Sequence, residues 1–158
     1  MDDRFFRKAM GSFATGVTVI TTKLNDEIYG MTANAFMSVS MHPKLVVVSI
    51  DNNAQMLKVI KEAKRYAVNV LSEDQQDLSK HFAGQIKTER EIKFKELREV
   101  PVVEDTMAQI TCDVIAEHEE GDHTLFIGKI RDIDLTENRP LIFYKGDYYK
   151  LEKKASLV

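Results

Sequence analysis

Residues 30–50 (GMTANAFMSVSMHPKLVVVSI) constrain the fold of this chain more than any other segment. Residues 44–50 are apolar at nearly every position, which predicts a central strand with both faces buried. The part before them is rich in small hydroxyl and amide residues, and we expect a loop there. A chain with this pattern must build a sheet around the apolar strand and hold the polar loop beside it.

The polar positions of this loop, Thr32, Asn34, Ser38 and Ser40, stand among Ala, Gly and Met. Donors and acceptors next to small residues suit a flat heteroaromatic ring with several carbonyl and nitrogen groups at its edge. An ordinary connection between strands has a similar composition, because Asn, Ser and Thr bond to their own backbone. The residues alone leave both interpretations open.

Other segments predict more strands than helices. Residues 108–116 alternate between apolar and polar side chains, which indicates a half-buried antiparallel strand. Asn25 and Asp26 predict a hairpin turn. Further strands are expected at residues 16–22, 27–33, 65–71, 123–134 and 141–151. Six or so strands with few helices favour a closed or nearly closed antiparallel barrel.

Three short helices are expected outside the sheet. They lie near residues 2–10, 55–64 and 72–84. Asp2 is placed to cap the first helix, Ser72 and Gln75 form a capping box for the third, and Gly84 ends it. Residues 85–99 are rich in charge, and we expect a solvated connection or a frayed helix there.

Length and composition exclude several classes of protein. The 158 residues are expected to form one domain, 1–158. With 44% hydrophobic residues, 30% charged residues and a net charge of -3, the chain gives no reason to expect nucleic acid. It has neither a signal pattern nor the run of about 20 apolar residues that a membrane helix needs, so we expect no membrane contact and a cytoplasmic protein.

Common catalytic motifs are absent or incomplete. Residues 11–18 (GSFATGVT) are close to a phosphate loop, but Val17 stands where the lysine is required. The four histidines have neither paired spacing nor cysteine partners, so we expect no metal site. Cys112, the only cysteine, alternates with core positions and is expected to be a small buried hydrophobic residue. No glycine triad of a Rossmann unit is present either.

Six segments in order along nearly the whole chain carry recognisable motifs. They are FATGVTVIT (13–21), MTANAFMSVS (31–40), YAVNVL (66–71), HFAG (81–84), GDHTLFIG (121–128) and residues 140–151. In combination they resemble the short-chain flavin reductases, and more closely the reductase components of bacterial two-component phenol hydroxylases.

The resemblance implies a mainly β fold, a six-stranded antiparallel split β-barrel with short peripheral helices, assembled as a homodimer. It implies an enzyme that transfers hydride from NADH to FAD or FMN and supplies reduced flavin to a separate oxygenase. The alternative is a non-catalytic module of the same fold that binds flavin for electron transfer or sensing. No catalytic side chain is expected, because the cofactor carries the chemistry.

The resemblance also implies which residues contact the ligands. The flavin-binding set is Thr32, Ala33, Asn34, Ala35, Ser38, Val39, Ser49, Ile50, Asp51, Asn53, Ala54, Gln55, His81, Phe82 and Gly84. The nicotinamide set is His123, Gly146 and Tyr148. Backbone N–H groups of residues 53–55 are expected to face a flavin phosphate at the positive end of a helix, with residues 81–84 as a second phosphate neighbour. Simple helix capping by Asn53 is the alternative.

Overall fold

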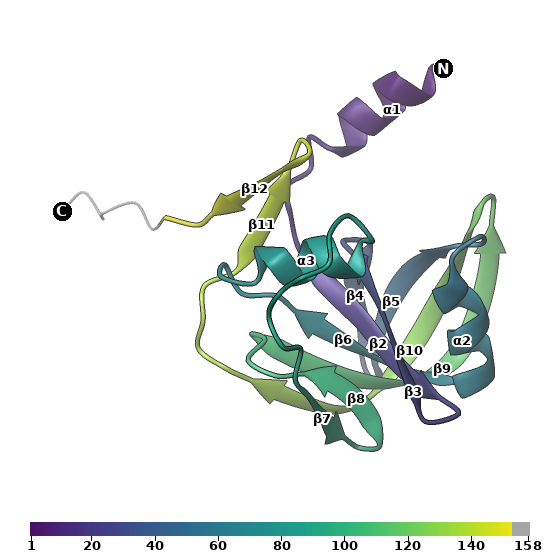
Figure 1. The fold of residues 1–158 in the computed structure, drawn as a ribbon. Coiled ribbons are helices and arrows are strands. Elements are labelled where there is room, and N and C mark those ends of the chain that lie inside the picture. Colours follow the sequence, from purple (N-terminus) through teal and green to yellow (C-terminus); the bar gives the residue numbers. More distant parts are fainter. Residues whose placement is uncertain (153–158) are drawn as a thin grey trace.

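The computed structural model describes residues 1–152, and most of its elements are strands (Figure 1). The helices are α1 (Asp3–Met10), α2 (Gln55–Ala63) and α3 (Gln76–Phe82). The strands are β1 (Thr15–Gly16), β2 (Thr18–Leu24), β3 (Glu27–Ala33), β4 (Phe36–Met41), β5 (Lys44–Asp51), β6 (Arg65–Val70), β7 (Phe94–Leu97), β8 (Val100–Val103), β9 (Ala108–Glu120), β10 (His123–Leu135), β11 (Leu141–Tyr144) and β12 (Asp147–Lys150). Residues 153–158, the end of the predicted domain, lie outside the described residues.

Seven strands form one antiparallel sheet in the order β3-β2-β6-β9-β10-β5-β4. β3 and β4 are the two edges of this sheet, although only Asn34 and Ala35 separate them in the chain. The sheet therefore curls until its edges meet at this corner, but no ladder of hydrogen bonds joins β3 to β4. The prediction of a mainly β chain with short helices is confirmed, whereas the six-stranded barrel is wrong in strand number and in closure.

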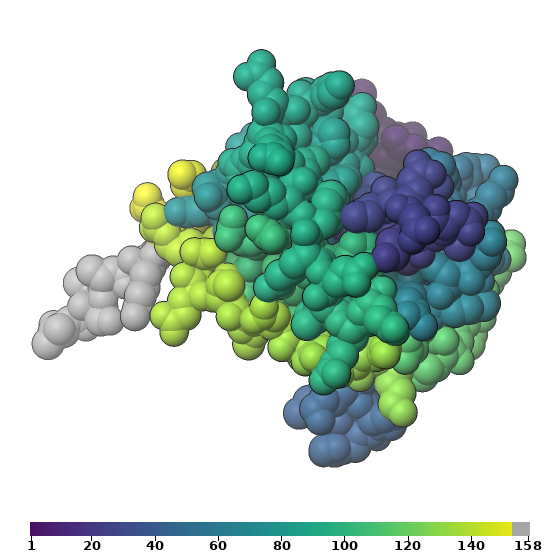
Figure 2. Space-filling model, turned by 60° about the horizontal axis from the view of Figure 1, so that its bottom comes forward, coloured from purple at the N-terminus to yellow at the C-terminus, as the bar shows by residue number. Residues whose placement is uncertain are grey.

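β4 occupies the segment where the sequence predicted a loop. It is an edge strand whose Ser38 and Val39 are exposed, with a register shift between Ser38 and Ser40. The end of the β4–β5 hairpin stands out from the body in Figure 2 (blue). An edge strand that contacts solvent over much of its surface needs no alternating apolar face, so its small polar residues do not distinguish it from a loop.

β5 has one buried face rather than two. Val46, Val48 and Ile50 point into the core and are at most 3% exposed. The alternate residues Val47 and Ser49 are only half-buried. This second face is apolar because it lines a surface hollow described below, and the sequence pattern could not distinguish that surface from a second core layer.

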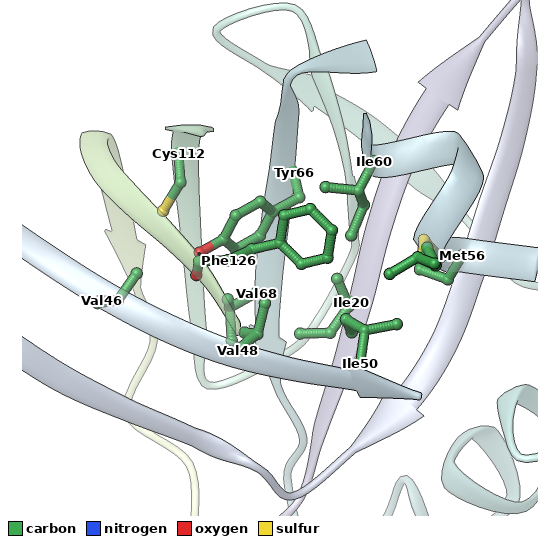
Figure 3. Packing of buried hydrophobic residues seen from close by; sticks show 11 residues of the cluster. Ile20, Val46, Val48, Ile50, Met56, Ile60, Tyr66, Val68, Cys112 and Phe126 are labelled. Atoms are coloured by element: carbon green, nitrogen blue, oxygen red, sulfur yellow. Dashed lines mark hydrogen bonds between the residues drawn. The ribbon is translucent and has the colours of Figure 1, made fainter. Parts of the chain in front are cut away.

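The main core lies inside the curl, where Tyr66 and Phe126 are its largest fully buried side chains (Figure 3). Tyr66 donates a hydrogen bond of 3.3 Å from its hydroxyl to the Phe126 carbonyl, and burial raises the pKa of this hydroxyl above its usual value. Gly128 lies directly beside this ring. A β-carbon there would overlap the Tyr66 hydroxyl and lie 2.8 Å from the β-carbon of Cys112.

The charge-rich segment 85–99 contains β7, which pairs with β8 in a hairpin on the outer face of the sheet. This segment (teal to green) lies across the near face of the molecule in Figure 2. Val100 and Val102 pack on Ala67, while Lys95 pairs with Asp134 at 2.6 Å. The prediction of a solvated connection is confirmed for residues 85–93, which lie outside any helix or strand and are mostly exposed. It is wrong for residues 94–97, which form β7, because charged side chains such as Lys95 bond to the main sheet and leave a narrow apolar face beneath.

Residues 141–151, expected as one strand, form the hairpin β11–β12 instead. Lys145 and Gly146 turn the chain with φ angles of 50° and 90°. β11 also pairs with β1, so that a small three-stranded sheet stands beside the main one and α1 projects beyond it (Figure 1). The predicted cap of α1 is confirmed, since Asp2 Oδ1 accepts a hydrogen bond of 3.2 Å from Arg4 N.

α3 begins later than its capping box predicted. The Gln75 side chain accepts a hydrogen bond of 2.9 Å from Ser72 N, but Ser72 Oγ donates to Asp74 rather than to the helix. The bond between Ser72 N and the Gln75 side chain therefore closes a turn before the helix, which begins at Gln76. Gly84 ends the segment with a φ of 71°, as expected.

We expect Gly128→Ala to destabilise the protein by about 1 to 3 kcal/mol, because the added methyl group has no room beside Tyr66. Gly16→Ala is the matched control, since a β-carbon at Gly16 meets nothing within 4 Å. Urea unfolding of both variants measures the difference. Equal unfolding free energies for the two variants would contradict this account of the core.

Candidate functional site

Three hollows lie side by side at the corner between β3 and β4. The corner cavity, about 700 Å³, is lined by Met10, Gly11, Phe13, Thr15, Asn34, Ala35, Phe36, Met37, Val47, Ser49, Leu125 and Phe143. The inner pocket, about 160 Å³, is lined by Val17, Thr32, Ala33, Asn34, Ser79, Ala83, Gln85, Phe143 and Tyr148. The helix cleft, about 280 Å³, is lined by Tyr29, Gly30, Met31, Ala54, Gln55, Met56, Phe82, Ala83 and Gly84. Asn34 and Phe143 belong to the first two, and Ala83 to the last two.

Hydrogen bonds to backbone carbonyls hold the corner residues in place. Thr18 donates from its hydroxyl to the Ala33 carbonyl at 2.6 Å. On the other side Ser49 N donates to the Ala35 carbonyl at 3.1 Å. Because both flanking carbonyls are bonded to neighbouring strands, the Asn34 side chain is presented to the cavity from a rigid support.

The corner cavity has an apolar wall and a few polar groups, as sites for flat organic ligands do. Val47, Leu125 and Phe143 supply the wall, while Asn34 and Ser49 carry polar side chains. Thr15 Oγ1 is buried and has no hydrogen-bond partner among residues 1–152. A buried hydroxyl without a partner is costly, and a polar ligand edge in the cavity would satisfy it.

The helix cleft has the chemistry of an anion site. The N-cap of α2 is Ala54, which offers no side-chain acceptor, and the first turn contains no acidic residue. Asp51 Oδ1 accepts from Asn53 N at 2.7 Å, so these two residues close a turn before the helix and Asn53 does not cap it. Ala54 N also donates to the Asp51 carbonyl, and Leu57 N donates to the Ala54 carbonyl. Of residues 53–55, expected to face the phosphate, only Gln55 therefore has an N–H group without a partner among the described residues, and Met56 N is available beside it at the positive end of the helix.

The opposite wall of the helix cleft comes from the end of α3. The Phe82 ring packs directly on the backbone of Gly30, where a β-carbon would overlap the ring. His81 braces it, with the two ring centroids 5.0 Å apart at an angle of 79°. His81 Nδ1 also accepts from Thr88 N at 3.3 Å. His81 thus supports Phe82 and is not itself part of the cleft lining.

The nicotinamide residues of the sequence analysis fall into two places. Gly146 and Tyr148 lie in a fourth hollow, the hairpin pocket of about 430 Å³, lined by Gln76, Lys80, Gln85, Phe143, Gly146, Asp147, Tyr148 and Tyr149. His123 lines none of these four hollows and stands opposite Asp51 in the β5–β10 ladder. Its Nδ1 lies 2.7 Å from Asp122 Oδ1, and this hydrogen bond lowers the pKa of Asp122.

The structure brings most of the flavin set together. Thr32, Ala33, Asn34, Ala35 and Ser49 line the corner cavity or the inner pocket, and Ala54, Gln55, Phe82 and Gly84 line the helix cleft. Ser38 and Val39 lie further along β4 and line none of these hollows. The Ile50 side chain is fully buried in the main core, so only its backbone can face a ligand.

Sequence reasoning missed several lining residues, including Phe13, Thr15, Ser79 and Phe143. Phe13 and Thr15 belong to the motif FATGVTVIT, so that motif carried a signal for them. Phe143 reaches the corner only because β11 pairs with β1, through the contact between Thr15 and Phe143. No local pattern reveals such a pairing.

Nothing in the described chain offers an alternative metal or thiol chemistry. Residues 1–152 contain no group of three His, Cys, Asp or Glu side chains placed to hold a metal ion. Cys112 is fully buried, and burial raises its thiol pKa to about 12. Across the same range, no helix is long and apolar enough to cross a membrane.

Comparison with known proteins identifies the class to which this site belongs. Residues 10–152 match the family model described as the flavin reductase like domain. An NADH-dependent flavin reductase from a Rhodococcus species is 42% identical over 149 residues, which is 92% of this chain and 85% of that protein. The reductase component of 4-hydroxyphenylacetate 3-monooxygenase from Thermus thermophilus is 36% identical, with 92% and 95% covered.

Solved structures agree with this match. The flavin reductase PheA2 in its native state superposes with a TM-score of 0.94 at 57% identity, covering 97% of this chain and 100% of that one. The NADH:FAD oxidoreductase SgcE6 of Streptomyces globisporus, in complex with NAD and FAD fragments, gives a TM-score of 0.89 at 30% identity, covering 98% and 96%. The chain belongs to the flavin reductase family, and the prediction of an oxidoreductase of this class is confirmed.

We expect Cys112 to be inert in the folded protein, because its thiol stays protonated and the thiolate is the reactive species. A water-soluble disulfide reagent at about pH 8 should label the unfolded chain rapidly and the native chain only at the rate of unfolding. Absorbance of the released thiol, with and without urea, measures this. Fast labelling of native protein would contradict the buried position.

Proposed function

We propose that this protein reduces FAD or FMN with NADH and releases the reduced flavin to a separate oxygenase. The observation that carries the proposal is that the corner cavity, inner pocket and helix cleft share lining residues and together gather nine residues expected to bind flavin. A cytoplasmic location, where NADH is available, fits this activity. One domain over residues 1–158 would hold both the flavin and the co-substrate.

The residues present fit a flavin. The ring would lie in the corner cavity, where Asn34, Ser49 and the unpartnered Thr15 hydroxyl can bond to its polar edge. The phosphate would lie in the helix cleft, against the N–H groups at the start of α2. Because no lysine or arginine lines this cleft, the helix end supplies the positive potential there.

Bound flavin supplies the hydride acceptor and NADH the donor, so the side chains have only to position the two rings and exclude water. The small residues Ala33 and Ala35 leave one side of the corner open for a second ring. Asn34 is held by the bonded carbonyls on either side of it and fixes the edge of the first ring. Tyr148 and Gly146, in the adjoining hairpin pocket, are proposed to hold the nicotinamide.

His123 is proposed as a further nicotinamide contact. Its bond to Asp122 fixes the orientation of the imidazole and leaves Nε2 directed away from the carboxylate. His123 lies apart from the hairpin pocket of the same chain. For His123 and Tyr148 to contact one nicotinamide, either the ligand reaches from one residue to the other or a second copy of the chain supplies one of the two residues.

The same hollows would also serve a module that binds flavin without turnover. The open side of the corner and the separate hairpin pocket favour the reductase, because a permanent electron carrier has no need for a second ligand site. Bleaching of flavin absorbance on adding NADH to the flavin-loaded protein distinguishes the two functions. Absence of bleaching would favour the module.

A homodimer is proposed from the outer face of the main sheet. Met37, Val47 and Ile127 are neighbours across β4, β5 and β10, and their side chains share the face away from the core. Met37 is 60% exposed, and Phe5 of α1 is 65% exposed. Contiguous exposed apolar residues indicate an interface. A twofold assembly through this face would cover the corner cavity, because Met37 and Val47 line it.

We expect Asn34→Leu to weaken the binding of flavin and His123→Ala to impair the use of NADH. Asn34→Leu removes amide bonds to the flavin edge and should raise the flavin dissociation constant by about 5- to 150-fold, equivalent to about 1 to 3 kcal/mol. His123→Ala should leave flavin affinity nearly unchanged and slow hydride transfer, or raise the KM for NADH, by about 10- to 100-fold. Flavin fluorescence titration and stopped-flow reduction measure the two effects.

Each of these variants is the control for the other. If His123 is a structural turn residue, its substitution should lower thermal stability and flavin retention together, with an intact rate per bound flavin. That result would remove His123 from the site. An unchanged flavin dissociation constant for Asn34→Leu would move the flavin ring away from the corner.

We expect sedimentation velocity at micromolar concentration to give a dimer, and Met37→Asp to shift it toward monomer because a charge would be buried at the interface. Ile28→Asp is the matched control, since Ile28 is also an exposed apolar residue, 40% exposed, but lies near the β2–β3 turn. A stable monomer for the unmodified protein would overturn the proposed assembly.

A further inference from the structure

Ser79 lies between the flavin side and the nicotinamide side of the proposed site. It belongs to α3 and is only 1% exposed. Its hydroxyl oxygen lies 2.8 Å from the Tyr148 hydroxyl, and its carbonyl accepts a hydrogen bond of 2.7 Å from Thr32 Oγ1. All three residues line the inner pocket. Ser79 thus bonds to Thr32, which is expected to contact flavin, and to Tyr148, which is expected to contact nicotinamide.

The bond to Thr32 determines what that hydroxyl can offer a ligand. A threonine hydroxyl has one proton and two lone pairs, and here the proton is directed to the Ser79 carbonyl. Thr32 therefore presents an acceptor to the inner pocket, next to Ala33 and Asn34 at the corner. An acceptor suits an N–H group at the edge of a cofactor ring.

The bond to Tyr148 fixes a ring that stands on a small separate sheet. Within residues 1–152, β12 pairs only with β11, and neither strand belongs to the seven-stranded sheet. Phe143 packs edge-on against Tyr148 with centroids 5.3 Å apart, and Lys80 Nζ lies 5.8 Å from the ring centre. Phe143 stands on the same hairpin as Tyr148. The hydrogen bond between the Ser79 and Tyr148 hydroxyls links α3 directly to the Tyr148 side chain.

We propose that Ser79 is a positioning residue for hydride transfer, which sets the Tyr148 ring through its hydroxyl and the Thr32 hydroxyl through its carbonyl. The proposal rests on the placement of flavin and nicotinamide given under Proposed function. Its two bonds come from different atoms, one from the side chain and one from the backbone. Substitution can therefore remove the first and keep the second.

Ser79→Ala removes the bond to Tyr148 and retains the carbonyl that accepts from Thr32. We expect the KM for NADH to rise about three- to tenfold, which is the change that loss of one hydrogen bond produces in a binding constant. The flavin dissociation constant, measured by fluorescence titration without NADH, should stay within about twofold of the original value. Tyr148→Phe should give the same pattern.

The two substitutions should not add. If Ser79 acts through Tyr148, the double variant should have the KM of either single variant, because the same bond is absent in all three. Additive increases in KM would overturn the proposal. So would an unchanged KM in Ser79→Ala.

Ser72→Ala is the matched control for lost packing and stability. Ser72 is also a buried serine, 2% exposed, whose hydroxyl bonds to a side chain just before α3 and lines none of the four hollows described above. It should lower the thermal midpoint as Ser79→Ala does, with an unchanged KM. An equal rise of KM in both variants would show that Ser79 has only a structural role.

Thr32→Val separates failure of this proposal from failure of the proposed site. It removes the hydroxyl that faces the inner pocket and should raise the flavin dissociation constant about three- to tenfold. If flavin affinity does not change, the flavin lies elsewhere and the proposed site fails together with this inference. If flavin affinity falls but Ser79→Ala has a normal KM, only the positioning role fails.

Discussion

The constraint on which the rest of the structure depends is the two-residue connection between the edges of the main sheet. β3 and β4 lie at opposite ends of the strand order, yet Asn34 and Ala35 alone separate them along the chain. Seven strands about 4.8 Å apart span nearly 30 Å when flat, which two residues cannot bridge. The sheet must curl, and its interior becomes the core around Tyr66 and Phe126.

The same constraint produces the candidate site. Where the edges meet without pairing, backbone groups and small side chains are left beside a hollow rather than inside a ladder. Helices and a hairpin from distant parts of the chain then complete the walls: α2 and α3 form the helix cleft, and β11 brings Phe143 to the corner cavity. Flavin chemistry needs such walls and no reactive side chain, because the cofactor carries the reaction.

Much of the local structure could be predicted from the sequence, because it depends on neighbours in the chain. The Asp2 cap and the Asn25–Asp26 turn follow from such local patterns. The strand β9 was also predicted, but its polar face is buried at Gln109 and Thr111, where Gln109 Nε2 donates to the Val103 carbonyl of β8. The predictions that were wrong concern segments whose structure depends on distant parts of the chain. β4 and β7 lie at an edge or on the outer face, where solvent and ion pairs replace an apolar face, and the second face of β5 is apolar because it lines a cavity.

The sequence by itself determined the family, the mainly β class and the corner residues 32–35, because the motif MTANAFMSVS keeps these site residues next to one another along the chain. Only the tertiary structure decided the number of strands, the open edge of the sheet, and the joining of residues 54–56 with 82–84 in one cleft. It also separated His123 from Tyr148 and placed Ser79 between Thr32 and Tyr148. The two hydrogen bonds of Ser79 join residues 47 and 69 positions apart in the chain. Such pairings depend on how the sheet curls and on which strands meet, not on local pattern.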